Sequence, residues 1–175
     1  MGQGSMIAGR APPWDINVVV EIPVRRESPG DGGGWLRGTA PCNPGNYGFV
    51  PDTRMPDGEP CEALVVGSVS VLPGAILRSR PIGVVELADD EGPEVTRLLA
   101  VPLERLHPFY AGTTSYRSLP AGLLDEITEF FVNFHDCEGS RPLRLARWGE
   151  AEEAARVMEA AIAKHRAELN GGKPR

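Results

Sequence analysis

Four apolar segments rich in β-branched residues occupy the first two thirds of the chain. They cover residues 16–24, 63–72, 76–87 and 96–101. Each is bounded by polar or turn-forming residues, and Pro73-Gly74 separates the second segment from the third. Runs of this length and composition are typical of strands, so we expect this part of the chain to form a sheet.

Helical periodicity begins only after Ser118. Apolar residues then recur at spacings of three and four, which predicts an amphipathic helix. The stripe consists of Leu123, Leu124, Ile127, Phe130, Phe131 and Phe134. A second helix is predicted over residues 150–169, with Gly171-Gly172 as its stop signal. We interpret His165, on its apolar face, as a packing or solvent-facing residue rather than a ligand.

Strands followed by helices indicate a small closed barrel flanked by helices, an α+β fold that is mainly β. A chain of 175 residues is long enough for one domain that buries its own core. Because no internal repeat or change of composition divides the chain, residues 16–170 are expected to be a single domain. Residues 1–15 would then be an N-terminal extension and residues 171–175 a tail.

Composition and charge narrow the function classes. The net charge of −6 argues against general nucleic-acid binding and favours a site that collects cations. No apolar run approaches the ~20 residues that span a bilayer, so no membrane is expected as a partner. The 3 cysteines form no metal-binding spacing, which indicates reduced thiols and a cytoplasmic protein.

The strongest chemical signal is the run Asp57-Gly58-Glu59-Pro60-Cys61-Glu62. It places three carboxylates at spacings of two and three residues, with a glycine and a proline between them. Carboxylates crowded in this way repel one another unless a divalent cation lies among them. Their hard oxygens favour Mg²⁺ or Mn²⁺ over zinc. The alternative interpretation of the pattern is a polar surface turn.

The acid run and its flanks resemble the family I soluble inorganic pyrophosphatases, whose signature is Asp-x-Asp-Pro-x-Asp. The other matching segments, in the family's order, are residues 18–23, 46–51, 73–76, 80–84, 89–92, 99–102, 130–131 and 148–149. The resemblance implies a five-stranded OB-like barrel with two C-terminal helices and a metal site on one rim. It also implies a homo-oligomer, a hexamer in most bacterial members, and diphosphate or a relative of it as substrate.

The resemblance assigns metal-binding roles to several acids. The positions are Asp57, Glu62, Asp90, Glu94 and Glu21. Asp90 is the ligand unless the alignment shifts by one residue to Asp89. An ungapped alignment places the next ligand on Val95, and a gap places it on Glu94. Glu21 matches an outer position of the family's site.

The catalytic positions are partly substituted. Glu59 stands where the family has an Asp that acts as base toward the attacking water. Tyr47 and Arg97 match phosphate-binding positions, and His135 replaces a phosphate-binding lysine. Phe134 replaces a tyrosine and so lacks its phenol. No lysine precedes Lys164, so arginine or histidine must supply any earlier phosphate-binding cation.

Three functions stay open at this point. The preferred function is a Mg²⁺-dependent phosphohydrolase that splits diphosphate, because metal binding gives a specific chemical reason for the clustered acids. A repurposed enzyme could use Glu59 or Glu62 on an organic substrate, and Trp35 with the glycine-rich residues 25–34 would suit a larger ligand. The third is a non-catalytic binding module. We interpret Cys42 and Cys61 as packing residues, since neighbouring acids suppress the Cys61 thiolate.

Overall fold

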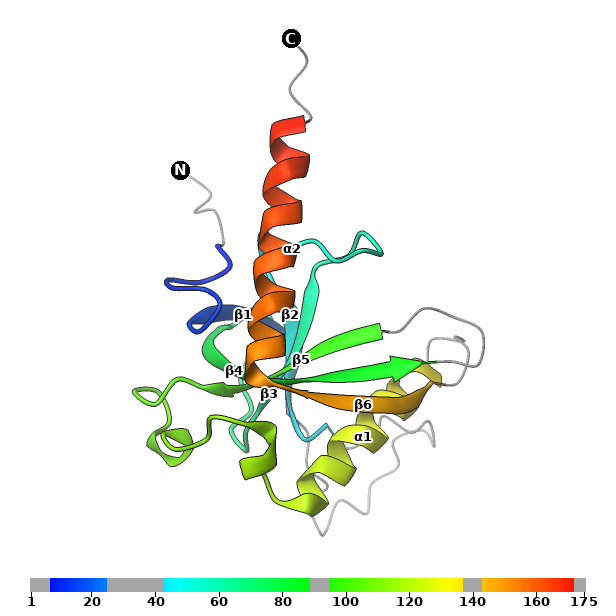
Figure 1. Cartoon of the computed structure of the whole chain (residues 1–175). Helices are drawn as coiled ribbons and strands as arrows, with labels where there is room; N and C mark the ends of the chain where they lie inside the picture. The colour runs from blue at the N-terminus through cyan, green and yellow to red at the C-terminus, as the bar shows by residue number, and fades with distance from the viewer. Residues whose placement is uncertain (1–6, 25–42, 89–94, 137–142, 172–175) are drawn as a thin grey trace.

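The computed structural model describes residues 7–24, 43–88, 95–136 and 143–171. Its elements in chain order are β1 (Ile16–Ile22), β2 (Gly45–Val50), β3 (Cys61–Val66), β4 (Ile76–Ala88), β5 (Val95–Pro102), α1 (Ala121–Asp136), β6 (Arg144–Glu150) and α2 (Ala151–Gly171) (Figure 1). Short 3₁₀ turns lie at Pro108–Tyr110 and Tyr116–Ser118. The prediction of a mainly β chain with two late helices is confirmed.

The strands form one sheet in the order β1-β2-β3-β5-β4-β6. Strand β1 also pairs with β4, so the pairings of β1 to β5 run in a ring, and β6 is added beside β4. The pairing of β3 with β5 is parallel, whereas the other pairings are antiparallel. This parallel pairing brings together two strands that are separated along the chain by all of β4.

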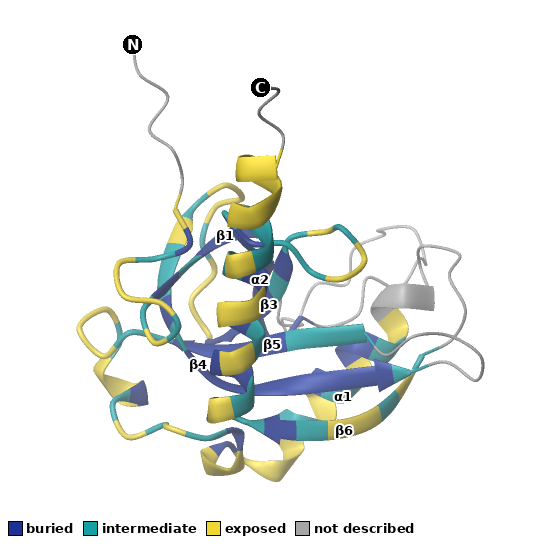
Figure 2. Cartoon of the chain, turned by 45° about the horizontal axis from the view of Figure 1, so that its top comes forward, coloured by how far each residue is buried: buried dark blue, intermediate teal, exposed yellow. Residues whose placement is uncertain are grey.

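The two helices cover different faces of the sheet. Successive side chains of a strand point to opposite faces, and in β5 Leu98 and Ala100 belong to one buried cluster while Leu99 and Val101 belong to the other. The first cluster contains residues of α2, and the second contains residues of α1. Figure 2 shows that α2 is exposed along its outer side and at its C-terminal turns.

The predicted strands agree with the observed ones to different degrees. The observed β4 is one residue longer than the predicted segment 76–87, and the observed β5 extends the predicted segment 96–101 by one residue at each end. The segment 63–72 leaves the sheet after Val66, and the Val69 carbonyl accepts a hydrogen bond from Asn46 Nδ2 at 2.9 Å instead. Two strands were not predicted: β2, whose short segment contains two glycines and an asparagine, and β6, of whose seven residues only Gly149 is buried.

Part of the predicted N-terminal extension contacts the sheet. Ala8 is buried and its carbonyl accepts a hydrogen bond from Asn17 N at 2.7 Å. Asp15 forms an ion pair with Arg78 of β4. Residues 25–34 and Trp35 lie outside the described residues. None of the described helices is long and apolar enough to cross a membrane.

Candidate functional site

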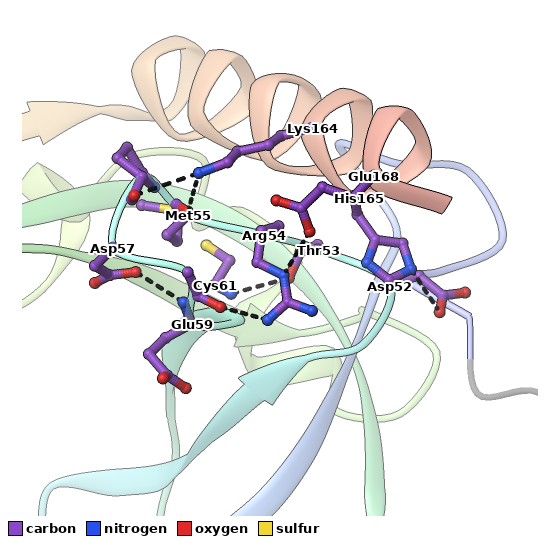
Figure 3. Close-up of polar contacts among 12 residues, drawn as sticks. Asp52, Thr53, Arg54, Met55, Asp57, Glu59, Cys61, Lys164, His165 and Glu168 are labelled. Carbon is purple, nitrogen blue, oxygen red and sulfur yellow. Dashed lines mark hydrogen bonds and ion pairs between the residues drawn. The ribbon is translucent and has the colours of Figure 1, made fainter. Parts of the chain in front are cut away.

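The acid run begins in a tight turn between β2 and β3. Gly58 N donates to Met55 O at 3.0 Å, and Met55 N donates to Glu59 O at 2.7 Å. Gly58 has a φ of 94°, a left-handed value that favours glycine. Asp57 Oδ1 accepts from Glu59 N at 2.9 Å, and both side chains are exposed (Figure 3). The turn therefore presents two carboxylates to solvent.

A single hydroxyl closes the loop that carries this turn. Thr53 Oγ1 donates to Val50 O at 2.5 Å and accepts from Cys61 N at 2.9 Å. Thr53 is buried, so both bonds are shielded from water. The hydroxyl thus joins the end of β2 to the first residue of β3.

Glu62 forms an ion pair with Arg97 across the parallel strands β3 and β5. The register pairs Ala63 with Leu98, which places Glu62 beside Arg97 on the face that α1 covers. Arg97 Nη2 lies 2.5 Å from Glu62 Oε2. The Arg97 side chain is 13% exposed and that of Glu62 is 27% exposed, so the acid is the more accessible partner.

Tyr47 of β2 completes this group. Its ring packs edge-on against Phe130 and Phe131 of α1, with ring centres 5.7 and 6.0 Å apart. Burial raises the pKa of Tyr47 well above its usual range, while the nearby charge of Arg97 lowers it and that of Glu62 raises it. The phenol therefore stays protonated and keeps its donor at neutral pH.

Glu21 of β1 is the second acid beside this group. Burial raises the pKa of Glu21, and the negative charge of Glu62 raises it further. Two carboxylates that repel each other are the kind of arrangement that a cation relieves. We call Glu21, Tyr47, Glu62 and Arg97 the rim group.

A hard divalent cation fits the chemistry of these donors. The exposed Asp57 and Glu59 and the crowded pair Glu21 and Glu62 all offer carboxylate oxygens. Among the described residues, no three His, Cys, Asp or Glu side chains lie close enough together to hold an ion. Two further predicted ligands, Asp90 and Glu94, lie outside those residues, and so does the side chain of His135. The donors fit in kind, and Arg97 engages Glu62 in this conformation.

Cys61 has the environment of a packing residue. It is a free thiol that is fully buried in the α2-side cluster. Burial raises its pKa to about 12, with Arg97 lowering it and Glu62 and Asp57 raising it. Cys42 lies outside the described residues.

Sequence reasoning missed the residues of α2 that contact the loop between β2 and β3, which carries the acid turn of Asp57 and Glu59. Lys164 Nζ donates to Met55 O at 2.8 Å, and Arg54 Nε donates to Glu168 at 3.1 Å (Figure 3). His165, predicted as a packing or solvent-facing residue, is half-buried with Nε2 3.6 Å from Asp52 Oδ1. More than a hundred residues separate the partners of each contact, so no local pattern indicates them. The absence of any lysine before Lys164 was the one available signal.

Comparison with known proteins gives one consistent result. A family model described as inorganic pyrophosphatase matches residues 38–166. The inorganic pyrophosphatase of Caulobacter vibrioides is 37% identical over 94% of this chain and 98% of the relative, and that of Pseudomonas aeruginosa is 35% identical over 93% and 98%.

Solved structures agree with the sequence relatives. An inorganic phosphatase from Anaplasma phagocytophilum has a TM-score of 0.77 at 32% identity, covering 92% of this chain and 99% of the other. The inorganic pyrophosphatase of Coxiella burnetii has a TM-score of 0.76 at 32% identity, covering 90% and 98%. With the acid turn, the rim group and these matches in agreement, the chain belongs to the inorganic pyrophosphatase family.

Proposed function

We propose that this chain hydrolyses inorganic diphosphate to two phosphates with a divalent cation, Mg²⁺ or Mn²⁺. Family I inorganic pyrophosphatases use a divalent metal. The observation that carries the proposal is the placement of Glu62 beside Tyr47 and Arg97, three residues after the exposed carboxylate of Glu59. A metal-binding acid, a phenol and a guanidinium in one place suit a phosphorylated substrate.

The acids would hold the metal. The proposed ligands are Asp57, Glu62 and Asp90, with Glu94 as a further ligand and Glu21 in an outer position. The bound cation would neutralise phosphate oxygens and acidify a water molecule. Arg97 holds Glu62 Oε2, so a metal would compete with this ion pair for that oxygen, and the 27% exposed side chain of Glu62 makes it accessible for binding.

The remaining residues would act on the water and on the phosphates. Glu59, exposed on its turn, would take a proton from the attacking water. Arg97, once released from Glu62, would donate to a phosphate oxygen, and its fork geometry allows two parallel bonds. Tyr47 would donate its phenolic proton from a fixed ring. His135 would contribute a further donor.

The alternatives are not favoured. A repurposed enzyme acting on an organic substrate and a non-catalytic module both lack support from the relatives, which are inorganic pyrophosphatases over nearly the whole chain. The features that motivated a larger ligand, Trp35 and residues 25–34, lie outside the described residues.

The test is phosphate release from diphosphate with Mg²⁺ and then Mn²⁺, compared with a Glu59→Gln variant. Loss of a general base costs about 10²–10⁴-fold in rate, so the variant should lose activity to that extent while binding metal. No release with either metal from the folded wild-type protein would overturn the proposal. Full activity in the variant would remove Glu59 from its role.

We further propose that the ring of pairings from β1 to β5 is an OB-like closed barrel. The pairing of β1 with both β2 and β4 supports this. Hydrogen-bond couplings measured by NMR should be continuous around the five strands, and a break between two of them would contradict the closed barrel.

We also propose a homo-oligomer, a hexamer by resemblance, in a reducing cytoplasmic setting. The loop after β3 and the start of β4 expose Val69, Leu72 and Ile76, with Leu72 80% exposed, which supports a covered apolar surface. The buried free thiol of Cys61 supports the reducing setting. Mass measurement in solution should give a multiple of the 18.8 kDa chain, and a monomer at micromolar concentration would contradict it.

A further inference from the structure

The C-terminal half of α2 forms hydrogen bonds and an ion pair with the loop that carries the acid turn. Lys164 Nζ donates to the carbonyls of Met55 at 2.8 Å and Pro56 at 3.3 Å. Arg54 N donates to the Ala161 carbonyl at 2.9 Å, and Arg54 Nε pairs with Glu168 at 3.1 Å. Figure 3 shows the contacts that the Lys164 and Glu168 side chains make with the loop. The helix therefore holds the loop through its backbone as well as through two side chains.

Lys164 is the α2 residue whose described contacts reach the turn directly. Met55 O accepts from both Lys164 Nζ and Gly58 N, so the ammonium and the hydrogen bond that closes the turn share one carbonyl. Pro56 O, the second acceptor, belongs to the residue before Asp57. Any shift of these two carbonyls would therefore move the carboxylates that follow them.

The helix supplies a rigid frame for this contact. Ala154, Met158 and Ala161 of α2 are buried in the cluster against the sheet. Lys164 lies less than one turn beyond Ala161 and is half-buried. A charged donor on an anchored helix forms stronger hydrogen bonds to carbonyls than a neutral one does. The position of the acid turn is thus tied to the core beneath α2.

We propose that Lys164 is a positioning residue that holds the Asp57–Glu59 turn where its carboxylates serve a divalent cation. The inference rests on the proposed function, since it assigns metal binding to Asp57. Lys164 makes its described contacts with backbone carbonyls and does not touch the reacting groups. It acts through the turn.

The direction in which cation affinity changes on removal of Lys164 distinguishes a positioning role from a simple electrostatic one. Removal of a positive charge near a cation site should strengthen cation binding, because a repulsive charge is lost. Removal of a positioning contact should weaken cation binding, because the ligands are no longer held in place. Loss of a group that orients metal ligands costs about 10–100-fold in affinity.

The experiment compares Lys164→Met, Lys164→Arg and Arg166→Met with the wild type. Arg166 is an exposed cation on the same helix, so Arg166→Met is a matched loss of charge. The first readout is Mn²⁺ affinity by calorimetry without substrate. The second is amide hydrogen exchange of residues 55–61 in metal-free protein. A thermal midpoint for each variant confirms that measurements are made on folded protein.

We expect Lys164→Met to weaken Mn²⁺ binding by about tenfold or more and to speed exchange across residues 55–61. Lys164→Arg, which can donate to both carbonyls, should keep Mn²⁺ affinity and hydrogen exchange near the wild-type values. Arg166→Met should match the wild type or bind Mn²⁺ slightly more tightly. Unchanged exchange in folded Lys164→Met, or unchanged or tighter Mn²⁺ binding, would overturn the inference. If the wild type binds no Mn²⁺, the proposed function fails on its own, and the exchange readout still decides whether Lys164 holds the turn.

Discussion

Two cross-strand arginine–glutamate pairs in the sheet have opposite exposures. In the pair of β3 and β5, Arg97 is 13% exposed and Glu62 is 27% exposed. In the pair of β4 and β6, Glu86 is 10% exposed and Arg147 is 50% exposed. One pair buries its cation and leaves the acid accessible, and the other does the reverse.

The two pairs also differ in how the neighbouring acid is affected. Arg147 bridges Glu86 and Glu153, and its hydrogen bond lowers the pKa of Glu153. In the rim group the pKa of Glu21 is raised, by burial first and then by Glu62. Each arginine therefore has two acids near it, and the difference lies in contact: Arg147 binds both Glu86 and Glu153, whereas the Glu21 pKa is raised beside the Arg97–Glu62 pair. We infer that an accessible acid next to a second acid with a raised pKa marks the site, and that ion pairing alone does not.

Replacement of the accessible acid should have the largest effect. Glu62→Gln removes a proposed ligand, so Mn²⁺ affinity should fall by about 100-fold, the upper cost of losing a group that only orients ligands. Calorimetry measures the affinity, and phosphate release should fall with it. Glu62→Asp keeps the charge and is the control, so its loss of Mn²⁺ affinity should be smaller than that of Glu62→Gln. Equal Mn²⁺ binding by Glu62→Gln and wild type would remove Glu62 from the metal site.

Replacement of the buried acid should affect stability rather than activity. Glu86→Gln weakens hydrogen bonding to Arg147, and because Arg147 is half exposed the thermal midpoint should fall by only a few degrees, at about 2–4 °C per kcal/mol for a domain of this size. Calorimetric unfolding measures the shift, and kcat should be unchanged well below the midpoint. A variant that is as stable as wild type and inactive would reverse the roles that we assign to the two pairs.

Removal of the buried cation should act with opposite signs on metal and substrate. Arg97→Met frees Glu62, so Mn²⁺ should bind more tightly without substrate. Loss of a phosphate donor should raise KM by about 10- to 100-fold, since charged hydrogen bonds contribute about 1.5–3 kcal/mol. Arg147→Met should change neither quantity. Weaker Mn²⁺ binding in Arg97→Met would show that Arg97 does not compete with the cation.

The smallest effect is expected at Glu21. Its raised pKa means that the ionised form is penalised in the folded state, so this cost is absent below the unfolded pKa of about 4.5 and complete above the folded pKa. Glu21→Gln should therefore make metal-free protein slightly more stable at pH 7, with the difference vanishing at acid pH. Thermal midpoints across pH measure it. A destabilised variant at pH 7 without metal would contradict the crowding of Glu21 and Glu62.

The sequence predicted the elements that have long apolar runs, and it missed β2, whose buried residues include two glycines and an asparagine. Strand β4 is buried over most of its length, so its apolar run gives both ends within one residue. Strand β6 lies at the end of the strand order and most of its residues are polar or partly exposed, so no apolar run marks it in the sequence. The first helix shows its stripe because Ile127, Phe130 and Phe131 pack against the sheet.

The site was predictable in its residues and not in its contacts. The spacing of Asp57, Glu59 and Glu62 is local and identified the acid turn. The pairing of Glu62 with Arg97 depends on a parallel pairing that skips β4, and no short-range pattern encodes such a register. The contact of Lys164 with Met55 likewise depends on how α2 crosses the sheet.

The hydroxyl of Thr53 has a consequence for how this site can vary among relatives. Its bonds to Val50 O and Cys61 N fix how many residues separate the two strands at the loop. Exchange of Asp for Glu changes the reach of a carboxylate and leaves that number intact, whereas an insertion or deletion would break the bridge. Divergent relatives should therefore differ in which acids they carry and agree in the length of the loop.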